Sequence, residues 1–250
     1  MRGKRFITAC MSVVCSCGLF IASGAAYAAS DDDVKIDEII RLNPYELTRE
    51  EVRTHLEEYS QETGKTQSEL LDQALMELRE QHALAVESGN QGSSFRSAGP
   101  GLVYLPTSYN KGDIYYTDAG SSGANWGHVG LYCDKRWLVE ASGIGKKSDW
   151  KWHYDLQVLR GTLLLEVKTN QVKRNIAADY AYNNLRDYPY NMVFWANKSL
   201  KPDKLNCSQL VWLAYYKSVG IDLDGNGGPG VYPRDIRDSP LTAVNWIVNS

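Results

Sequence analysis

The sequence has few cysteines, and most of them lie near its start. Of five cysteines in 250 residues, Cys10, Cys15 and Cys17 belong to the first apolar segment, which leaves Cys133 and Cys207 in the rest of the chain. Small domains that depend on disulfides carry more cysteines than this, so a disulfide scaffold is excluded. A single bridge between Cys133 and Cys207 remains open from the sequence.

Basic residues are not in excess either. The chain has 27 Lys and Arg residues and 30 Asp and Glu residues, which gives a formal net charge of −3. Proteins that bind nucleic acids neutralise phosphates with clustered Lys and Arg side chains. We therefore expect no nucleic-acid partner.

Long apolar runs are confined to the first 28 residues. A basic start, Arg2–Arg5, is followed by an uncharged apolar segment that ends in Ala26-Tyr27-Ala28. This order is typical of a secretory signal peptide cleaved after Ala28, whereas a transmembrane anchor would be longer and would end in charged residues. Loss of the three basic residues in residues 1–28 would lower the formal net charge from −3 to −6. We expect a secreted or cell-envelope protein with no stable membrane anchor.

Residues 29–86 are expected to be helical. Leu71, Leu75 and Leu78 recur at helical spacing. Thr48 and Glu51 form a capping box, and Gly64 marks a break between two helices. Such a region could be a propeptide, an accessory module or a packing layer.

Residues 87–101 have a different composition. They are rich in Ser and Gly, which is typical of a flexible linker. A separable helical region predicts that deleting residues 29–97 leaves a folded core with equal or higher activity.

Residues 102–250 alternate between strand-like runs and helices, which predicts one α+β domain with a sizeable core. The predicted elements are strands over residues 113–117, 128–133, 136–141 and 162–168, and helices over residues 176–186 and 207–219.

Cys207 stands at the predicted start of the last helix. The free N–H groups and the dipole of a helix N-terminus favour a thiolate. The backbone N–H groups of Cys207 and Ser208 could also stabilise an oxyanion on an attacked carbonyl. Taken alone, a cysteine before an apolar run is more often a packed core residue.

His128 and Glu140 supply the groups that a nucleophilic thiol requires. If a turn centres on Asp134 and Lys135, the two strands form a hairpin that places His128 roughly opposite Glu140 and Ala141. A carboxylate that orients an imidazole, which in turn serves a thiol, is the logic of a catalytic triad.

These motifs together resemble a known family. The ordered set GDIYY, GHVGLY, LVEAS, NCSQLVW and VYPRDI is similar to circularly permuted papain-like cysteine hydrolases of the YiiX/YycO-like branch of the NlpC-type cell-wall hydrolase superfamily. The resemblance covers roughly residues 100–240. It implies a permuted papain-like fold with an antiparallel sheet packed on the Cys-bearing helix, here preceded by a small helical region. It assigns the nucleophile to Cys207, the base to His128 and the third polar residue to Glu140.

The resemblance implies a cysteine amidohydrolase or endopeptidase that cleaves an amide through an acyl-enzyme, in peptidoglycan stem peptides or a related substrate. Two alternatives remain. One is an acyltransferase or a lipid or thioester hydrolase with the same triad, and the other is a non-catalytic ligand-binding module. Trp126 and Tyr190 are candidates for lining the substrate cleft, with core packing as their alternative role.

No metal or organic cofactor is expected. The segment Asp222-Leu-Asp224-Gly-Asn226-Gly resembles the first half of a calcium-binding loop, but its twelfth position holds Pro233 where an EF-hand has Glu. We therefore expect a loop rich in Gly and Asn at this point.

Overall fold

The computed structural model describes residues 30–96, 101–121 and 123–248. The predicted signal peptide, residues 1–28, lies outside these ranges. Within them the chain forms the helices α1 (Asp31–Leu42), α2 (Arg49–Thr63), α3 (Gln67–Arg96), α4 (Gln171–Asn184), α5 (Cys207–Val219) and α6 (Pro233–Asp238). The strands are β1 (Leu102–Tyr104), β2 (Ile114–Thr117), β3 (Gly120–Ser121), β4 (Ala124–Asn125), β5 (His128–Asp134), β6 (Trp137–Glu140), β7 (Asp149–Trp152), β8 (Gln157–Leu159), β9 (Leu163–Val167) and β10 (Thr242–Ile247), with a 3₁₀ turn at His153–Asp155.

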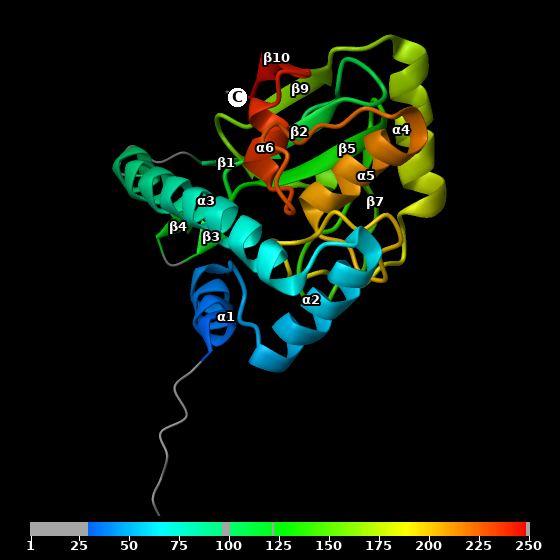
Figure 1. Ribbon diagram of the computed structural model, residues 1–250. Coiled ribbons are helices and arrows are strands. Elements are labelled where there is room, and N and C mark those ends of the chain that lie inside the picture. Colours follow the sequence, from blue (N-terminus) through cyan, green and yellow to red (C-terminus); the bar gives the residue numbers. More distant parts are fainter. Residues whose placement is uncertain (1–29, 97–100, 122, 249–250) are drawn as a thin grey trace, which may run out of the picture.

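The centre of the molecule is an antiparallel sheet in the order β10-β9-β2-β5-β6-β7. Helices α4 and α5 pack together and against β5, and α5 also reaches β6 (Figure 1). Apolar side chains from β2, β5, β6 and β9 join those of the two helices in one buried core. The α+β class predicted from the sequence is confirmed, with the Cys-bearing helix lying against an antiparallel sheet.

Opposite faces of the strands enter different cores, as the alternation of side chains along a strand requires. Ile114 and Tyr116 of β2 face the core shared with α4 and α5, whereas Tyr115 joins a second core with Tyr132 and Leu138. The short pair β1–β8 contributes to this second core through Val103 and Val158.

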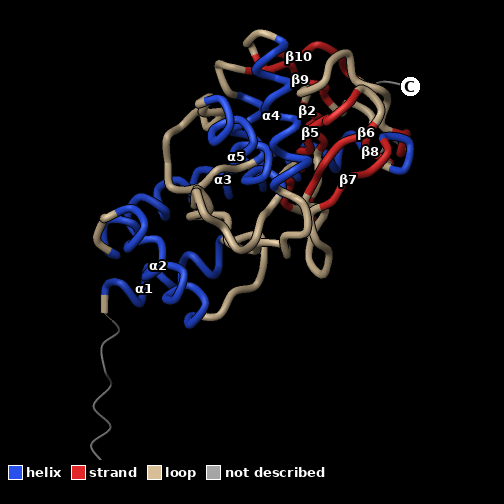
Figure 2. Tube along the Cα trace, turned by 90° about the vertical axis from the view of Figure 1, so that its right-hand side faces the viewer, coloured by secondary structure: helices blue, strands red, loops and turns tan. Residues whose placement is uncertain are grey.

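The first three helices form a compact group on the far side of α5 from most of the strands (Figure 2). Capping boxes begin α1 at Ser30 and α2 at Thr48, and Gly64 caps the C-terminus of α2. The predicted Thr48–Glu51 capping box and the break at Gly64 are therefore present. The apolar faces of the three helices share a buried cluster with the segment Val193–Ala196 and with Tyr232.

The contacts between the helical group and the rest of the chain are specific. His55 of α2 bonds through Nε2 to the carbonyl oxygen of Ala196, at 2.5 Å, and its ring packs edge-on against fully buried Trp195. Tyr45, between α1 and α2, packs on Phe194. The helical group is thus packed against the rest of the fold through a buried cluster and specific contacts.

The predicted linker is helical along most of its length, because α3 continues to Arg96. Gly and Ser are weak helix formers, but an established helix extends through them at a modest cost when tertiary contacts hold it. Gly89 also has a packing role: a Cβ there would lie 1.9 Å from the carbonyl oxygen of Gly123, so the missing side chain lets α3 approach the β3–β4 hairpin. Composition alone does not reveal this contact.

Two further predictions need correction. Helix α4 begins at Gln171, five residues before the predicted start, because Asn170 caps it by accepting a hydrogen bond from the backbone N–H of Lys173. The β5–β6 hairpin contains a bulge between Tyr132 and Asp134, which shifts the register so that Leu131 pairs with Val139.

None of the helices in the described ranges is both long enough and apolar enough to cross a membrane.

The buried cluster that α1, α2 and α3 share with Val193–Ala196 changes what we expect when the helical region is deleted. Deleting residues 29–97 would expose Phe194 and Trp195, so we now expect an insoluble or strongly destabilised core, measured by soluble yield and urea unfolding. A milder probe is Leu78→Ala on α3, which should lower the free energy of unfolding by about 2–5 kcal/mol. Met76→Ala, whose side chain is 72% exposed on the same helix, should change it little. A soluble truncated core with normal stability would contradict the packing-layer interpretation.

Candidate active site

Cys207 is the first residue of α5 and is 2% exposed. Asn206 caps the helix: its side-chain oxygen accepts the N–H of Gln209 at 2.9 Å, and its backbone carbonyl accepts the N–H of Leu210. The first N–H groups of a helix have no partner inside it, so those of Cys207 and Ser208 remain directed out of the helix end. These two N–H groups are the ones that the sequence suggested as oxyanion donors.

Buried hydrogen bonds fix this end of α5. Ser208 donates its hydroxyl to the carbonyl oxygen of Val231 at 2.7 Å, and Asn197 donates to the same oxygen at 3.0 Å. The Val231 N–H returns a bond to Asn197 at 2.7 Å, and Asn197 also donates to the cap oxygen of Asn206. Because all four groups are buried and paired, the start of α5 is held rigidly.

His128 and Glu140 lie at the same end of the sheet, since β5 begins at one and β6 ends at the other. The Nε2 atom of His128 is 3.0 Å from Oε2 of Glu140. Cys207 lies close enough to the imidazole for the charge of its sulfur to raise the pKa of His128. As Nε2 is engaged with the carboxylate, the other ring nitrogen, Nδ1, is the one available to the thiol. The three residues predicted from the sequence are thus brought together in the order Cys207, His128, Glu140.

The Glu140 side chain is buried and has several donors. Ser142 and Lys151 bond to Oε1 at 2.8 and 2.6 Å, while Tyr115 donates its hydroxyl to Oε2 beside His128. A buried carboxylate is stable when its lone pairs are occupied in this way. The residues Tyr115, Ser142 and Lys151 were not identified from the sequence as part of the site.

Gly130 allows the Tyr115 ring to reach across the sheet. It pairs with Tyr115 on β2, and a Cβ at this position would lie 2.4 Å from a Tyr115 ring carbon and 3.2 Å from the Cβ of Glu140. The hairpin bulge places Gly130 beside Glu140. We had predicted that His128 lies roughly opposite Glu140 and Ala141, but His128 reaches the carboxylate diagonally across the two strands. The role of Gly130 depends on the strand register, which the sequence alone does not reveal.

Charges at the site favour an ion pair. Burial alone would lower the pKa of His128, but the negative charge and hydrogen bond of Cys207, followed by those of Glu140, raise it to about 10. Burial alone would likewise raise the pKa of Glu140, but His128 and Lys151 hold it well below its usual range. The arrangement stabilises an imidazolium beside the ionised Glu140 carboxylate.

Tyr190 lies near the thiol. Its hydroxyl is 3.2 Å from that of Tyr45. Burial, together with the charge of Cys207, raises the pKa of Tyr190 far above its usual range. The helical group therefore contributes Tyr45 to the surroundings of the nucleophile, a contact between positions distant in the sequence.

A cavity of about 860 Å³ opens beside this end of α5, between α2 and residues 190–204. Tyr190 and Gln209 line it on the side of the nucleophile helix. Most of its other lining residues are polar, among them Glu50, Glu58, Glu62, Asn191, Lys201 and Lys204.

Trp126, the other predicted cleft residue, lies elsewhere. Its ring stacks on Tyr232 and packs against His82 of α3, and it is not among the residues that line the 860 Å³ cavity. The structure thus gives Trp126 the packing role that was its alternative.

The two cysteines of the described chain are both free and buried. Cys133 lies in the core on β5, where burial raises its pKa far above the usual range. A disulfide between Cys133 and Cys207 is therefore not formed.

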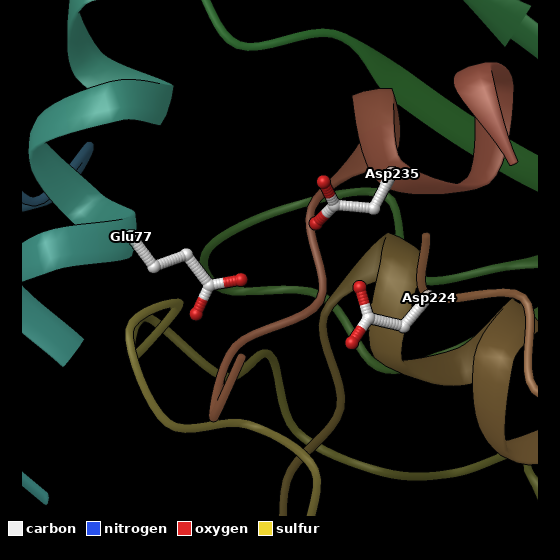
Figure 3. Close-up of side chains that lie close together, drawn as sticks. All are labelled: Glu77, Asp224 and Asp235. Carbon is white, nitrogen blue, oxygen red and sulfur yellow. The ribbon is translucent and has the colours of Figure 1, made fainter. Parts of the chain in front are cut away.

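The loop expected to be a plain Gly/Asn-rich turn contributes to a second polar cluster. Asp224 lies near Glu77 of α3 and Asp235 of α6, with ligand oxygens of the three side chains within 4.8 Å of one another (Figure 3). These carboxylates are the residues in the described ranges best placed to hold a metal ion. Sequence analysis missed the cluster because Glu77 is far from the loop along the chain.

Comparison with known proteins gives one informative match and one weak structural likeness. No family model matches the sequence. A chain from Escherichia coli O157:H7, described as metalloprotein yiiX, DUF1105, is 17% identical and has a TM-score of 0.41, with 59% of this chain and 100% of that chain covered.

The uncharacterised protein YycO of Bacillus subtilis (strain 168) is 31% identical over 251 residues. The match covers 98% of both chains, so it includes the helical group as well as the sheet and α5. On this whole-length similarity, the chain belongs to the YycO family.

Proposed function

We propose that this protein is a cysteine-dependent hydrolase that cleaves an amide bond through Cys207, His128 and Glu140. The observation that carries the proposal is the position of His128, whose ring is hydrogen-bonded to the Glu140 carboxylate and lies close enough to Cys207 for the charge of the sulfur to raise the pKa of the imidazole. A base that bridges an orienting carboxylate and a nucleophile is the arrangement used for covalent acyl transfer.

The reaction follows from this geometry. The Cys207 sulfur attacks the substrate carbonyl carbon, and the oxyanion that develops is stabilised by the N–H groups of Cys207 and Ser208. The His128 imidazolium protonates the leaving amine, which leaves a thioester on Cys207. Neutral His128 then takes a proton from water, whose oxygen attacks the thioester, and the acid product and the free thiol are released. Glu140 stays ionised and keeps the ring oriented.

The chain order of the groups also supports the proposal. The His and Glu strands precede the Cys helix, as the resemblance to circularly permuted papain-like hydrolases of the NlpC-type superfamily requires. The predicted leader is consistent with an extracellular or envelope substrate.

Tyr190, which lies near the thiol, lines the 860 Å³ cavity, whereas Cys207, His128 and Glu140 are not among its lining residues. Beside apolar side chains such as Leu47 and Met192, the lining carries acidic and basic ones, including Glu58, Glu62 and Lys204. A long acyl chain would bury apolar surface against such groups at a cost, whereas a peptide with its own charges would find partners. We therefore favour a peptidoglycan stem peptide or a related polar peptide over a lipid.

The nucleophile assignment predicts opposite results for the two cysteines. Cys207→Ala should reduce hydrolysis of muropeptides by about 10⁴-fold or more, because no other group replaces the thiolate. Cys133→Ala, a matched change in the core, should retain activity. The assay is chromatographic separation of muropeptide products, run in parallel with acyl-lipid and thioester substrates. Cleavage of the lipids alone would favour the acyl-hydrolase alternative, and equal activity of Cys207→Ala and wild type would leave the binding-module alternative.

The ion pair predicts a distinct alkylation profile. In the wild type, iodoacetamide should modify Cys207 rapidly even near pH 6, because the imidazolium stabilises the thiolate. In His128→Ala, the rate should rise with pH as it does for an ordinary thiol, with a pKa of about 8.5. Peptide mass spectrometry reports Cys133 in the same sample as an internal buried control, and denatured protein verifies that both thiols can be labelled. A Cys207 that resists labelling in the folded wild type would argue for a packing role.

The proposed role of Glu140 predicts a shift in the pH dependence of kcat/KM when this residue is changed. The imidazolium that protonates the leaving amine is present below the His128 pKa of about 10, so kcat/KM should fall as the pH rises through that value. Glu140→Gln removes a negative charge next to the ring and therefore lowers the pKa of His128, which moves this basic limb to lower pH. Ser142→Ala, which removes one hydrogen bond to the same carboxylate but no charge, should leave the limb close to its wild-type position. An unmoved limb in Glu140→Gln would show that Glu140 does not control the ring.

A further inference from the structure

Three buried carboxylates from distant parts of the chain meet away from Cys207. Glu77 lies on α3, Asp224 follows α5 and Asp235 is on α6, and their side chains point toward one another (Figure 3). Their residues are 5%, 9% and 7% exposed. Mutual repulsion and burial both oppose three negative charges in this space, so the cluster needs positive charge or protons.

The positive charge supplied by the protein is insufficient. Lys198 forms an ion pair with Asp224 and also donates to the carbonyl oxygen of Gly228, at 2.8 Å. Among the described residues, Glu77 and Asp235 have no ion-pair partner within 4 Å. Three carboxylates and one ammonium leave a net charge of −2, which one divalent cation would neutralise.

Glu77 provides an independent indication of a ligand. Its Oε2 accepts the backbone N–H of Gly230 at 2.9 Å, but its buried Oε1 has no hydrogen-bond partner in the part of the chain that the structure describes. The carboxylate is directed toward Asp224 and Asp235 (Figure 3). A buried acceptor without a donor is costly unless an ion or another group occupies the space in front of it.

The other two carboxylates are oriented by hydrogen bonds. Asp235 accepts bonds from Gln81 at 2.8 Å and Asn226 at 3.1 Å on one oxygen, and from the backbone N–H of Tyr232 at 2.7 Å on the other. Each carboxylate oxygen retains a further lone pair after one such bond. Outer partners that fix the direction of acidic ligands are typical of metal sites.

The donor set defines the class of ion. All three side chains offer carboxylate oxygens, with no histidine or cysteine in the group. Oxygen ligands of this kind suit calcium, magnesium and manganese, whereas zinc and copper sites in proteins usually include nitrogen or sulfur.

We propose that Glu77, Asp224 and Asp235 bind a divalent cation of the hard, oxygen-preferring class, and that this ion ties α3 to the loop before α6. The loop runs from Asp224 through Gly230, which bonds to Glu77, to Val231, whose carbonyl holds Ser208 at the start of α5. The cation thereby stabilises the packing of the helical group and the anchor of the nucleophile helix. This structural role does not depend on the proposed amidase activity.

The alternative to a cation is a proton. Burial, with the nearby charges of Asp235 and Asp224, raises the pKa of Glu77 to about 8, and burial raises that of Asp235 to about 7. A cluster relieved by protonation would not respond to metal ions, so the two explanations give different results.

The test is thermal unfolding of the mature full-length chain after dialysis against EDTA. Adding millimolar Ca²⁺, Mg²⁺ or Mn²⁺ should raise the midpoint by about 5 °C or more for at least one of these ions. Glu77→Gln should lose this rise, yet without metal it should be at least as stable as the wild type, because the amide keeps the shape and removes a buried charge. Glu80→Gln, exposed on the same helix, should keep the full rise.

A measurement on the wild type does not depend on the folding of any variant. Tb³⁺ bound in the cluster should luminesce on excitation of Tyr59 and Tyr232, which lie near these carboxylates, and Ca²⁺ should displace it. Three results would overturn the proposal: no stabilisation and no displaceable luminescence in the wild type, a rise that survives in Glu77→Gln, or a response confined to Zn²⁺.

Discussion

The anchored N-terminus of α5 is the constraint on which the rest of the site depends. The N–H groups at a buried helix end need hydrogen-bond acceptors. Here the side-chain oxygen of Asn206 accepts the N–H of Gln209 in the first turn of α5. Asn197, Ser208 and Val231 then lock the cap to a neighbouring loop. Because this network fixes the start of α5, the Cys207 thiol is held near His128 with little freedom. Rigid support of this kind is what accurate positioning of a nucleophile requires.

Glu140 is the corresponding fixed point on the sheet. Its carboxylate binds donors from three strands and one turn, so the position of His128 is set by the register of β2, β5 and β6. The contact between Tyr115 and the carboxylate exists because Gly130 leaves room for the ring. A bulky residue at Gly130 would therefore disturb the site without touching any reacting atom.

The helical group packs against the segments that hold the start of α5. It packs on the segment Val193–Ala196, which begins three residues after Tyr190 and leads to Asn197 in the α5 anchor. It also brings Tyr45 close to the thiol and Glu77 to the loop that ends in Val231. The full-length similarity to YycO fits a fold in which this group and the sheet form one structural unit.

The sequence by itself determined the local features of this protein. The capping box at Thr48, the break at Gly64, the limits of α5 and the hairpin that carries His128 and Glu140 depend on signals a few residues apart, and such signals are visible in the chain. The composition of residues 87–96 predicted a flexible linker, but these residues continue helix α3. Contacts of Gly89 with a distant hairpin outweigh the weak helix propensity of Ser and Gly.

Tertiary structure alone decided which distant groups meet. Tyr115 with Glu140, Tyr45 with Tyr190, and Glu77 with Asp224 and Asp235 are contacts made by packing and strand register. Packing also placed Trp126 and Tyr190 in different surroundings, although the sequence made both of them candidates for lining the substrate cleft. The physical reason is that a side chain's neighbours across a fold depend on how whole elements pack, and no pattern within one element encodes that.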